Sequence, residues 1–297
     1  MLLSQIRVQD DKVQVVARDG TEAYVIRNCR STYDLALDCA NQGVSLKNRI
    51  GALGLGPAVD VEGALAAGDV LAPVHHPDPT QMFLSGAGLI RTESVVAMQR
   101  GNHDWLFKGN GYAVGAPGMD LVMRECAGRD HRGPAIAAIY VINNAGLPFR
   151  IGFAHASDFS DLALTTDSYL RLMQATLRHV AFGPELLLGD LPQAWRGTSR
   201  ISRNNGAVYE KSLSSNDQHV VNCIVKMEND HFTSDVIRQP GQLHIHIIAT
   251  ATAPFADEFV LLSGDHAEVA IPQFGLPLRN SLRVATLPET AVHVRAL

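Results

Sequence analysis

One unbroken apolar run restricts the possible folds of this chain more than any other feature of its sequence. The run spans Ala135–Ile142, and the turn residues Asn143, Asn144 and Gly146 follow it. A second apolar segment, Phe149–Ala154, begins shortly after the turn. An apolar run of this length, bounded by turn residues and followed by a partner segment, predicts a buried strand in a β-hairpin.

Strands are expected to predominate in the rest of the chain as well. The expected helices are few: Ser31 or Thr32 caps one, Val61–Gly68 forms a second that its glycine closes, and Asp167–Met173 forms a third. Many strands, few helices and abundant glycine and proline predict an α+β, mainly β fold. The expected strands are Ile6–Val8, Val13–Val16, Ala23–Ile26, His219–Val225, Leu243–Ile248 and Ala267–Ile271.

A proline-rich segment divides the sequence. Pro73, Pro77 and Pro79 lie within seven residues, which is typical of a connection between two units. We therefore expect a small N-terminal α/β domain over residues 1–78 and a larger domain over residues 79–297. A chain of 297 residues with 46% apolar residues can bury a full core without disulfide bonds.

Charge and composition exclude several functional classes. The net charge of −5 argues against a nucleic-acid surface, which needs clustered Lys and Arg. The sequence has no run of about 18 apolar residues, so no membrane span is expected. The N-terminus lacks the basic and apolar regions of a signal peptide, and the four cysteines are widely spaced. Both features favour reduced thiols in a cytoplasmic protein.

Five short motifs occur in a fixed order along most of the chain. They are Phe107–Gly111, Asp158–Asp161, Ala181–Leu186, Arg196–Arg200 and Ala249–Thr252. Their order resembles the fumarylacetoacetate hydrolase superfamily over about residues 70–285, nearest to the branch of the 2-keto-3-deoxyarabinonate dehydratases. The resemblance implies a fumarylacetoacetate hydrolase-like β-roll with a smaller N-terminal domain, which usually forms a homodimer.

The resemblance also implies metal-assisted chemistry. In such enzymes, a Glu-x-Glu pair at the start of the long strand and an acid at the end of the hairpin hold an ion of the Mg²⁺ type. The cation chelates the carboxylate and keto oxygens of a 2-oxo acid and stabilises an enolate.

This sequence departs from that pattern at the metal ligands. The Glu-x-Glu pair aligns with Gly133-Pro134-Ala135, and only the third acid remains, as Asp158. A single carboxylate is a poor Mg²⁺ site, because this ion gives up its waters reluctantly. A lysine that often touches substrate in the family aligns with Thr176 or a neighbouring residue. We therefore expect a site that binds no metal and no cofactor.

Two charged residues are the candidates for catalysis. Asp158 either acts as a general base in the former metal cavity, or is a loop carboxylate that accepts hydrogen bonds from nearby backbone N–H groups. Lys108 either pairs with a substrate carboxylate, replacing part of the metal charge, or is an exposed loop lysine.

Four further residues are candidates for substrate binding. Thr250 matches a family threonine that holds a substrate carboxylate, although its residue type also suits any strand. Arg200 has the bidentate geometry for a carboxylate, and a surface or interface ion pair is the alternative. Thr176 takes the place of the lysine. His103 precedes an aspartate, but adjacent strand residues point to opposite faces, which favours a surface pair.

His244 and His246 have the sharpest metal-like spacing in the chain. Residues i and i+2 of a strand share a face, so both imidazoles could bind one Zn²⁺ or Fe²⁺. Alternatively, they line a solvated face opposite Leu243, Ile245 and Ile247. His131 and His155 are further conceivable replacement ligands.

Three functional hypotheses follow. The first is a repurposed enzyme that binds a small carbonyl- or carboxylate-bearing substrate and catalyses a lyase, hydrolase, isomerase or cyclisation step without Mg²⁺. In it, Asp158 moves protons while Lys108 and Thr250 hold the anion. The second is a metal-dependent 2-keto-3-deoxy sugar-acid dehydratase with a site rebuilt from histidines. The third is a non-catalytic ligand-binding homologue, because a fold does not determine a function.

Overall fold

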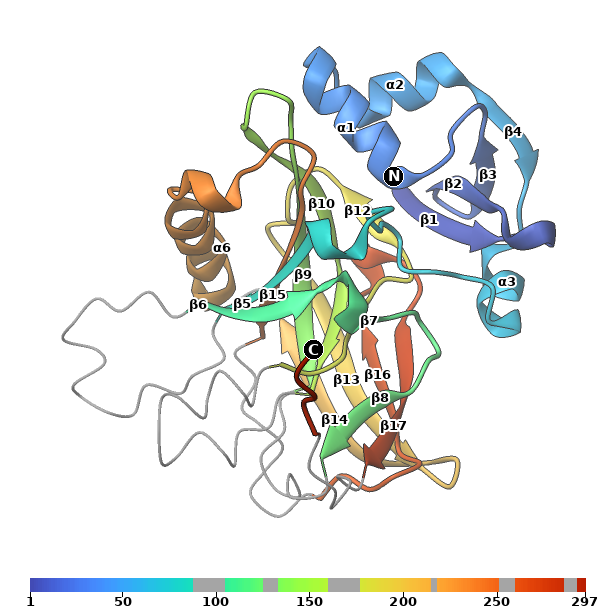
Figure 1. Cartoon of the computed structure of the whole chain (residues 1–297). Helices are drawn as coiled ribbons and strands as arrows, with labels where there is room; N and C mark the ends of the chain where they lie inside the picture. Colours follow the sequence, from blue (N-terminus) through green and yellow to red (C-terminus); the bar gives the residue numbers. More distant parts are fainter. Residues whose placement is uncertain (88–104, 125–132, 160–176, 215–217, 251–259, 286–292) are drawn as a thin grey trace.

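Two β-sheets form the framework of the protein (Figure 1). The computed structural model describes residues 1–87, 105–124, 133–159, 177–214, 218–250, 260–285 and 293–297. Within this part of the chain, the larger sheet has twelve strands and the smaller has five. The larger sheet contains β1 (Leu2–Arg7), β2 (Val13–Asp19), β3 (Glu22–Ile26), β4 (Leu55–Ala58), β5 (Met82–Ala87), β6 (Trp105–Asn110), β7 (Val114–Gly115), β9 (Pro134–Ile142), β10 (Pro148–Asp158), β11 (Val180–Phe182), β12 (Leu186–Leu188) and β15 (Leu243–Ala249). The smaller sheet contains β8 (Leu121–Arg124), β13 (Arg196–Arg203), β14 (Gly206–Ser214), β16 (His266–Ala270) and β17 (Leu278–Ala285).

The predicted central hairpin is confirmed. β9 pairs with β10 in antiparallel register, from Ile142 opposite Pro148 to Pro134 opposite Ser157. On its other side β9 pairs with β15, also antiparallel. From Ala135 to Ile142 every side chain of β9 is buried, because both faces of the sheet are covered. The apolar run is continuous for this reason, since a strand with one solvated face would alternate with polar residues.

The N-terminal strands continue the large sheet. The main strand order is β4-β3-β2-β1-β12-β10-β9-β15-β5-β6, so β1 joins the central strands through β12. The helix α1 (Thr32–Gln42) starts at Ser31, whose hydroxyl accepts a hydrogen bond from the N–H of Asp34, and packs on the face that contains Ile139. The expected second helix is α3 (Val61–Ala67), which Gly68 closes. The division at residue 78 stays a prediction.

A buried ion pair also links these first strands to the C-terminal half. Arg18 on β2 donates from Nε to Oε1 of Glu185 over 2.8 Å, and the Glu185 side chain is fully buried. Glu185 also accepts a hydrogen bond from the N–H of Leu276. The remaining helical segments are α2 (Leu46–Leu53) and the short 3-10 turns Gln9–Asp11, Pro79–Gln81, Gly111–Ala113, Asp235–Ile237 and Pro272–Phe274.

The strand expected over His219–Val225 is wrong, because this segment belongs to the helix α6 (Gln218–His231). Val220, Ile224 and Met227 are buried at helical spacing and pack on the second face of the large sheet, beside Tyr140. A short apolar run with β-branched residues fits a strand or a buried helix equally well, and only the contact with the sheet decides. The expected helix over Asp167–Met173 lies outside the described residues.

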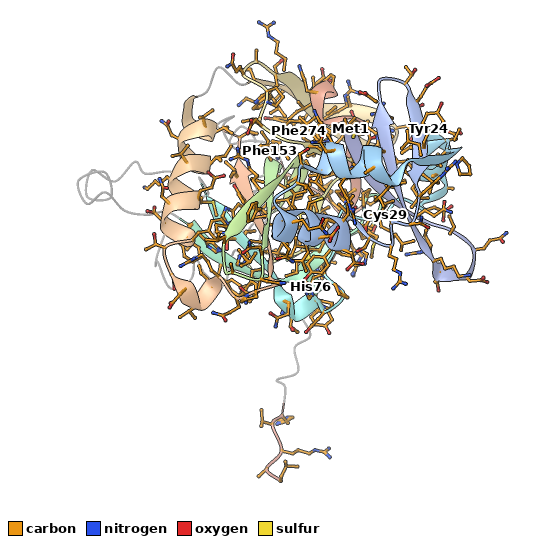
Figure 2. The ribbon with its side chains drawn as sticks, turned by 90° about the horizontal axis from the view of Figure 1, so that it is seen from above. Met1, Tyr24, Cys29, His76, Phe153 and Phe274 are labelled. Atoms are coloured by element: carbon orange, nitrogen blue, oxygen red, sulfur yellow. The ribbon has the colours of Figure 1, made fainter. Side chains whose placement is uncertain are left out.

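Side chains fill the space between these layers (Figure 2). Phe153 on β10 and Phe274 belong to the core cluster beneath α6. None of the helices in the described ranges has the length and apolar character that crossing a bilayer requires.

Close backbone contact leaves no room for a side chain at Gly152 on β10. A Cβ at this position would overlap the carbonyl oxygen of Leu187 on β12. Gly152→Ala should therefore lower the free energy of unfolding by about 1–3 kcal/mol, measured by urea denaturation. Gly51, inside α2 with open space around its Cβ position, is the matched control. Gly51→Ala should stabilise the protein by about 0.5–1 kcal/mol, and a loss in that variant would contradict the helix described there.

Candidate functional site

Three neighbouring strands bring the aligned motif positions together at one edge of the large sheet. Ala135 on β9 lies opposite Ala156 on β10 and opposite Ala249 on β15. Asp158 follows at the end of β10, where its N–H donates to the carbonyl of Gly133 over 2.8 Å. On the other side of β9, the Thr250 hydroxyl donates to the carbonyl of Pro134 over 3.1 Å. The structure thus groups positions 133, 135, 158 and 250, which are distant in sequence.

Lys108 reaches this edge because β6 contains a bulge. Phe107 pairs with Ser85 on β5 and Gly109 pairs with Leu84, so Lys108 is the extra residue. Bulges re-aim side chains in this way. The Lys108 ammonium lies 3.0 Å from Oδ1 of Asp158, and neither side chain is more than 2% exposed. The two sequence-based candidates for catalysis therefore form one buried ion pair.

Burial governs the protonation of this lysine. Removal from water lowers the pKa of Lys108 below its ordinary value, and the Asp158 carboxylate opposes the shift by favouring the charged form. The nearby Arg178 guanidinium adds to the lowering. Burial and the Asp158 carboxylate therefore act in opposite directions on the charge of Lys108.

The residues at this edge do not fit the Mg²⁺ ion of the resembling enzymes. In the alignment that the sequence predicts, Gly133 and Ala135 stand at the Glu-x-Glu positions, and neither provides a side-chain oxygen for a cation. The remaining carboxylate, Asp158, already contacts the positive charge of Lys108. Among the residues that the structure describes, no three His, Cys, Asp or Glu side chains are placed to hold a metal ion.

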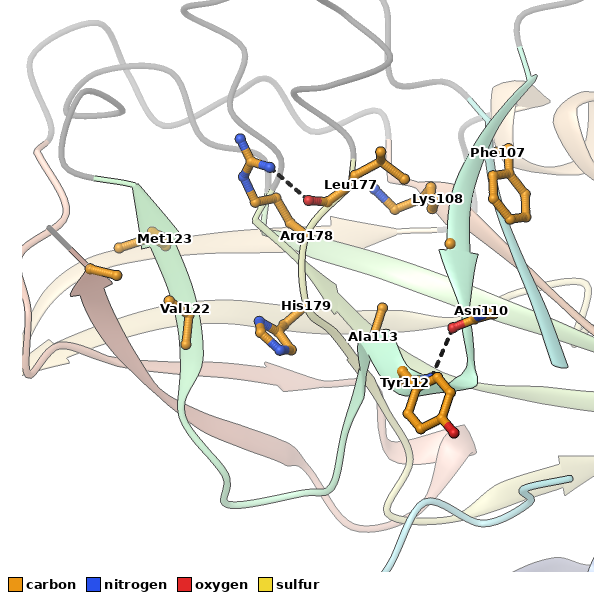
Figure 3. A pocket seen from close by; sticks show the side chains of 12 residues that line it. Phe107, Lys108, Asn110, Tyr112, Ala113, Val122, Met123, Leu177, Arg178 and His179 are labelled. Atoms are coloured by element: carbon orange, nitrogen blue, oxygen red, sulfur yellow. Dashed lines mark hydrogen bonds between the residues drawn. The ribbon is translucent and has the colours of Figure 1, made fainter. Parts of the chain in front are cut away.

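A pocket of about 500 Å³ adjoins Lys108. Figure 3 shows β8, with Val122 and Met123, on one side and β6, with Lys108, on the other. The segment Leu177–His179 lies between them. Arg178 and His179 are site residues that the sequence analysis missed. The sequence could have indicated them, because they are two basic residues just before the motif that starts at Ala181. They also lie close to Thr176, the position that aligns with the family lysine.

Among the other substrate-binding candidates, Arg200 lies in the described part of the chain and is outside this group. Arg200 lies on β13, where its guanidinium contacts the exposed side chain of Glu210 at 2.7 Å and approaches Glu268 at 3.9 Å. This is the surface ion pair that the sequence left open as the alternative. Thr176 and His103 lie outside the described residues, as does His131.

The expectation of a solvated face at His244 and His246 is wrong. Both side chains are fully buried between β15 and α6, where His231 joins them. His231 Nε2 lies 3.0 Å from Nδ1 of His244, and Nε2 of His244 lies 3.3 Å from Oε1 of Gln242. Alternation predicted correctly that the two histidines share a face, but the helix that covers this face had been taken for a strand.

His155 is also buried in the core. Its Nε2 lies 2.8 Å from the N–H of Ile271 and 3.1 Å from the carbonyl oxygen of the same residue. Burial lowers the pKa of His155 to about 4, so the ring is neutral near pH 7. These contacts describe a core histidine that bonds to backbone groups.

The comparison with known proteins rests on structure. No protein-family model matches the sequence, and no curated protein sequence matches it. Among solved structures, 2-keto-3-deoxy-D-arabinonate dehydratase complexed with magnesium and 2,5-dioxopentanoate has a TM-score of 0.72 at 18% identity. The match covers 97% of this chain and 100% of the dehydratase.

Two further structures match over similar lengths. Maleylpyruvate hydrolase from Sphingobium sp. SYK-6, in complex with manganese(II) and pyruvate, has a TM-score of 0.59 at 17% identity, covering 96% of this chain and 99% of the hydrolase. Fumarylacetoacetate hydrolase from psychrophilic Exiguobacterium antarcticum has a TM-score of 0.57 at 13% identity, covering 96% and 100%. This chain therefore has the fold of the fumarylacetoacetate hydrolase superfamily, which the order of its sequence motifs predicted.

Proposed function

We propose that this protein is an enzyme that acts on a small carbonyl- or carboxylate-bearing molecule without a bound divalent cation. The reaction is of the lyase, hydrolase, isomerase or cyclisation type. One observation carries the proposal: the buried Lys108–Asp158 ion pair occupies the edge of β9, β10 and β15 at which the aligned Glu-x-Glu positions lack carboxylates.

The pair supplies the charges that such a reaction needs. The Lys108 ammonium is a fixed positive group that can hold a substrate carboxylate or stabilise the oxygen anion of a developing enolate. In a buried site this attraction is much stronger than in water. Asp158, held at hydrogen-bond distance from Lys108, takes or returns the proton at the adjoining carbon or oxygen. The Thr250 hydroxyl is the expected neutral contact to the substrate carboxylate, and it must turn away from the carbonyl of Pro134 to donate to that carboxylate.

The solved structures support the substrate class. The hydrolase was captured with pyruvate and the dehydratase with 2,5-dioxopentanoate, and both molecules carry a carboxylate beside a carbonyl. We expect no such cation in this protein, because Gly133 and Ala135 lack side-chain oxygen ligands. A homodimer and a cytoplasmic location stay predictions of the sequence.

Pyruvate binding tests the proposal. Titration calorimetry should give the same dissociation constant with and without EDTA, within about twofold. Lys108→Met should weaken binding by about tenfold or more, because the bound carboxylate loses its charged partner. Arg200→Gln, which removes a surface guanidinium away from this edge, is the matched control and should bind pyruvate as the unchanged protein does.

Two results would overturn the proposal. One is pyruvate binding that requires Mg²⁺ or Mn²⁺, together with one equivalent of metal found in the purified protein by elemental analysis. The other is pyruvate binding that does not change in the Lys108→Met variant. Binding without turnover of any 2-oxo acid would leave the non-catalytic ligand-binding hypothesis in place of the enzyme.

A further inference from the structure

The pocket beside Lys108 presents two chemically different surfaces. Its basic side chains are Lys108 from β6 and Arg178 and His179 from the segment before β11. The opposite wall is apolar and comes from Val122 and Met123 on β8. We infer that this pocket selects a carboxylic acid with an apolar aryl or alkyl body, and discriminates against polyhydroxylated acids. This inference deepens the proposed function and rests on it.

The charge of the lining selects an anion. The described residues that line the pocket include three basic side chains and no Asp or Glu. Arg178 lies near enough to Lys108 to disfavour its charged form. The Asp158 carboxylate offsets part of the Lys108 charge, and Arg178 adds a second positive group that attracts a ligand carboxylate. An arginine and a lysine together also suit the two oxygens of one carboxylate.

The exposed part of the lining, here called the rim, also carries large apolar side chains. Tyr112 is 73% exposed and Leu177 is 49% exposed, and both line the pocket. Large apolar side chains that gather around one opening mark a ligand or partner site more often than isolated ones do. The aryl or alkyl body of a bound acid would cover Leu177 and Val122, which removes apolar surface from water on both molecules.

Sugar-like hydroxyl groups find few partners in this lining. The neutral polar side chains among the described lining residues are Asn110 and Tyr112. The Asn110 side-chain oxygen already accepts a hydrogen bond from the N–H of Tyr112 over 3.2 Å. Hydroxyls placed against Val122 and Met123 would lose their hydrogen bonds to water without replacement, which is unfavourable. The same wall that favours a phenyl or branched alkyl group therefore disfavours a polyol chain.

Three probes test the inference by calorimetry on the whole chain. Phenylpyruvate carries an apolar body, 2-keto-3-deoxyarabinonate carries hydroxyls, and pyruvate carries neither. Phenylpyruvate should bind about tenfold or more tightly than pyruvate, because it covers the apolar wall. 2-Keto-3-deoxyarabinonate should bind no more tightly than pyruvate.

Two substitutions separate the two surfaces. Leu177→Gln should reduce the advantage of phenylpyruvate over pyruvate by about threefold or more and leave pyruvate itself unchanged. Arg178→Gln should weaken the binding of both phenylpyruvate and pyruvate. Val236→Gln is the matched control for Leu177→Gln, because Val236 is 74% exposed and belongs to a 3-10 turn outside this pocket. It should change neither affinity.

Tighter binding of 2-keto-3-deoxyarabinonate than of phenylpyruvate would overturn the inference, as would phenylpyruvate binding that Leu177→Gln leaves unchanged. Leu177→Gln could instead change the molecular mass of the protein measured by light scattering and leave the affinities for both acids unchanged. In that case the rim is an interface between copies of this chain, and the inference is wrong. These failures leave pyruvate binding and its dependence on Lys108 intact. Phenylpyruvate binding that depends on Leu177 and Arg178 but not on Lys108 would support the inference and contradict the proposed function.

Discussion

Lys108→Met will lower the free energy of unfolding by about 3–5 kcal/mol, since it removes the ammonium that contacts the buried Asp158 carboxylate. A surface ion pair would give a far smaller effect, because water solvates the charge that remains. Urea denaturation of both proteins at pH 7.5 measures this loss, from the midpoint and slope of each unfolding curve.

The double variant Lys108→Met/Asp158→Asn distinguishes stability from function. Removing both charges should recover most of the lost stability, because no uncompensated charge is then buried. The same variant should still fail to bind pyruvate, because the positive group that holds the carboxylate is absent. Arg200→Met, which breaks an exposed pair between β13 and β14, is the control and should hardly change the unfolding curve.

Two outcomes would contradict this picture. A Lys108→Met variant as stable as the unchanged protein would mean that Asp158 is solvated, and that the pair is not a buried element of the site. A double variant that recovers stability and also binds pyruvate normally would show that the pair has only a structural role.

Local sequence patterns were sufficient for much of the fold. The β9–β10 hairpin followed from its apolar run and turn residues, and α1 and α3 followed from Ser31 and Gly68 at their ends. These signals act within a few residues, so they survive whatever packs around them. The strand predicted over His219–Val225 was wrong because the apolar residues of α6 pack against the large sheet. This contact joins segments that are far apart in sequence, so no local pattern reveals it.

The candidate site was predictable as a set of residues but not as an arrangement. Asp158, Lys108 and Thr250 could be named from motif positions, and the structure gathers them at one edge. The ion pair itself was not predictable, because a bulge on β6 directs Lys108 toward Asp158. Arg178 was missed because the alignment pointed to Thr176, two positions earlier.

Acid will destabilise this protein well before its carboxylates are protonated, because four histidines are buried. Burial lowers the pKa of His155 and of His231 to about 4, lowers that of His244 to about 3, and holds that of His246 well below its ordinary value. In the unfolded chain each would titrate near pH 6.5. Between pH 6.5 and 4 the unfolded state therefore binds more protons, so stability falls as the pH falls. His155 alone accounts for a loss of about 3 kcal/mol over that interval.

The histidines beneath α6 give this acid sensitivity a specific location. In the bond between His231 Nε2 and His244 Nδ1, one nitrogen donates and the other accepts. Because Nε2 of His244 faces the acceptor oxygen Oε1 of Gln242, Nδ1 of His244 is the acceptor and carries no proton. Protonating His244 removes the acceptor and places a charge against Phe83 and Phe232. The helix α6 should therefore be the part of the described fold that loosens first, visible as faster amide hydrogen exchange at pH 5 than at pH 7.5 after correction for intrinsic rates.

His246→Leu tests the assignment, because neither ring nitrogen of His246 has a hydrogen-bond partner in the described part of the chain. An apolar replacement removes no hydrogen bond, so stability at pH 7.5 should stay equal or rise. The loss between pH 6.5 and 4 should shrink, because one fewer buried group must take up a proton. His266→Gln, at an exposed position on β16, is the matched control and should leave the pH dependence unchanged. An equal acid loss in His246→Leu and in the unchanged protein would assign the sensitivity to groups other than the cluster beneath α6.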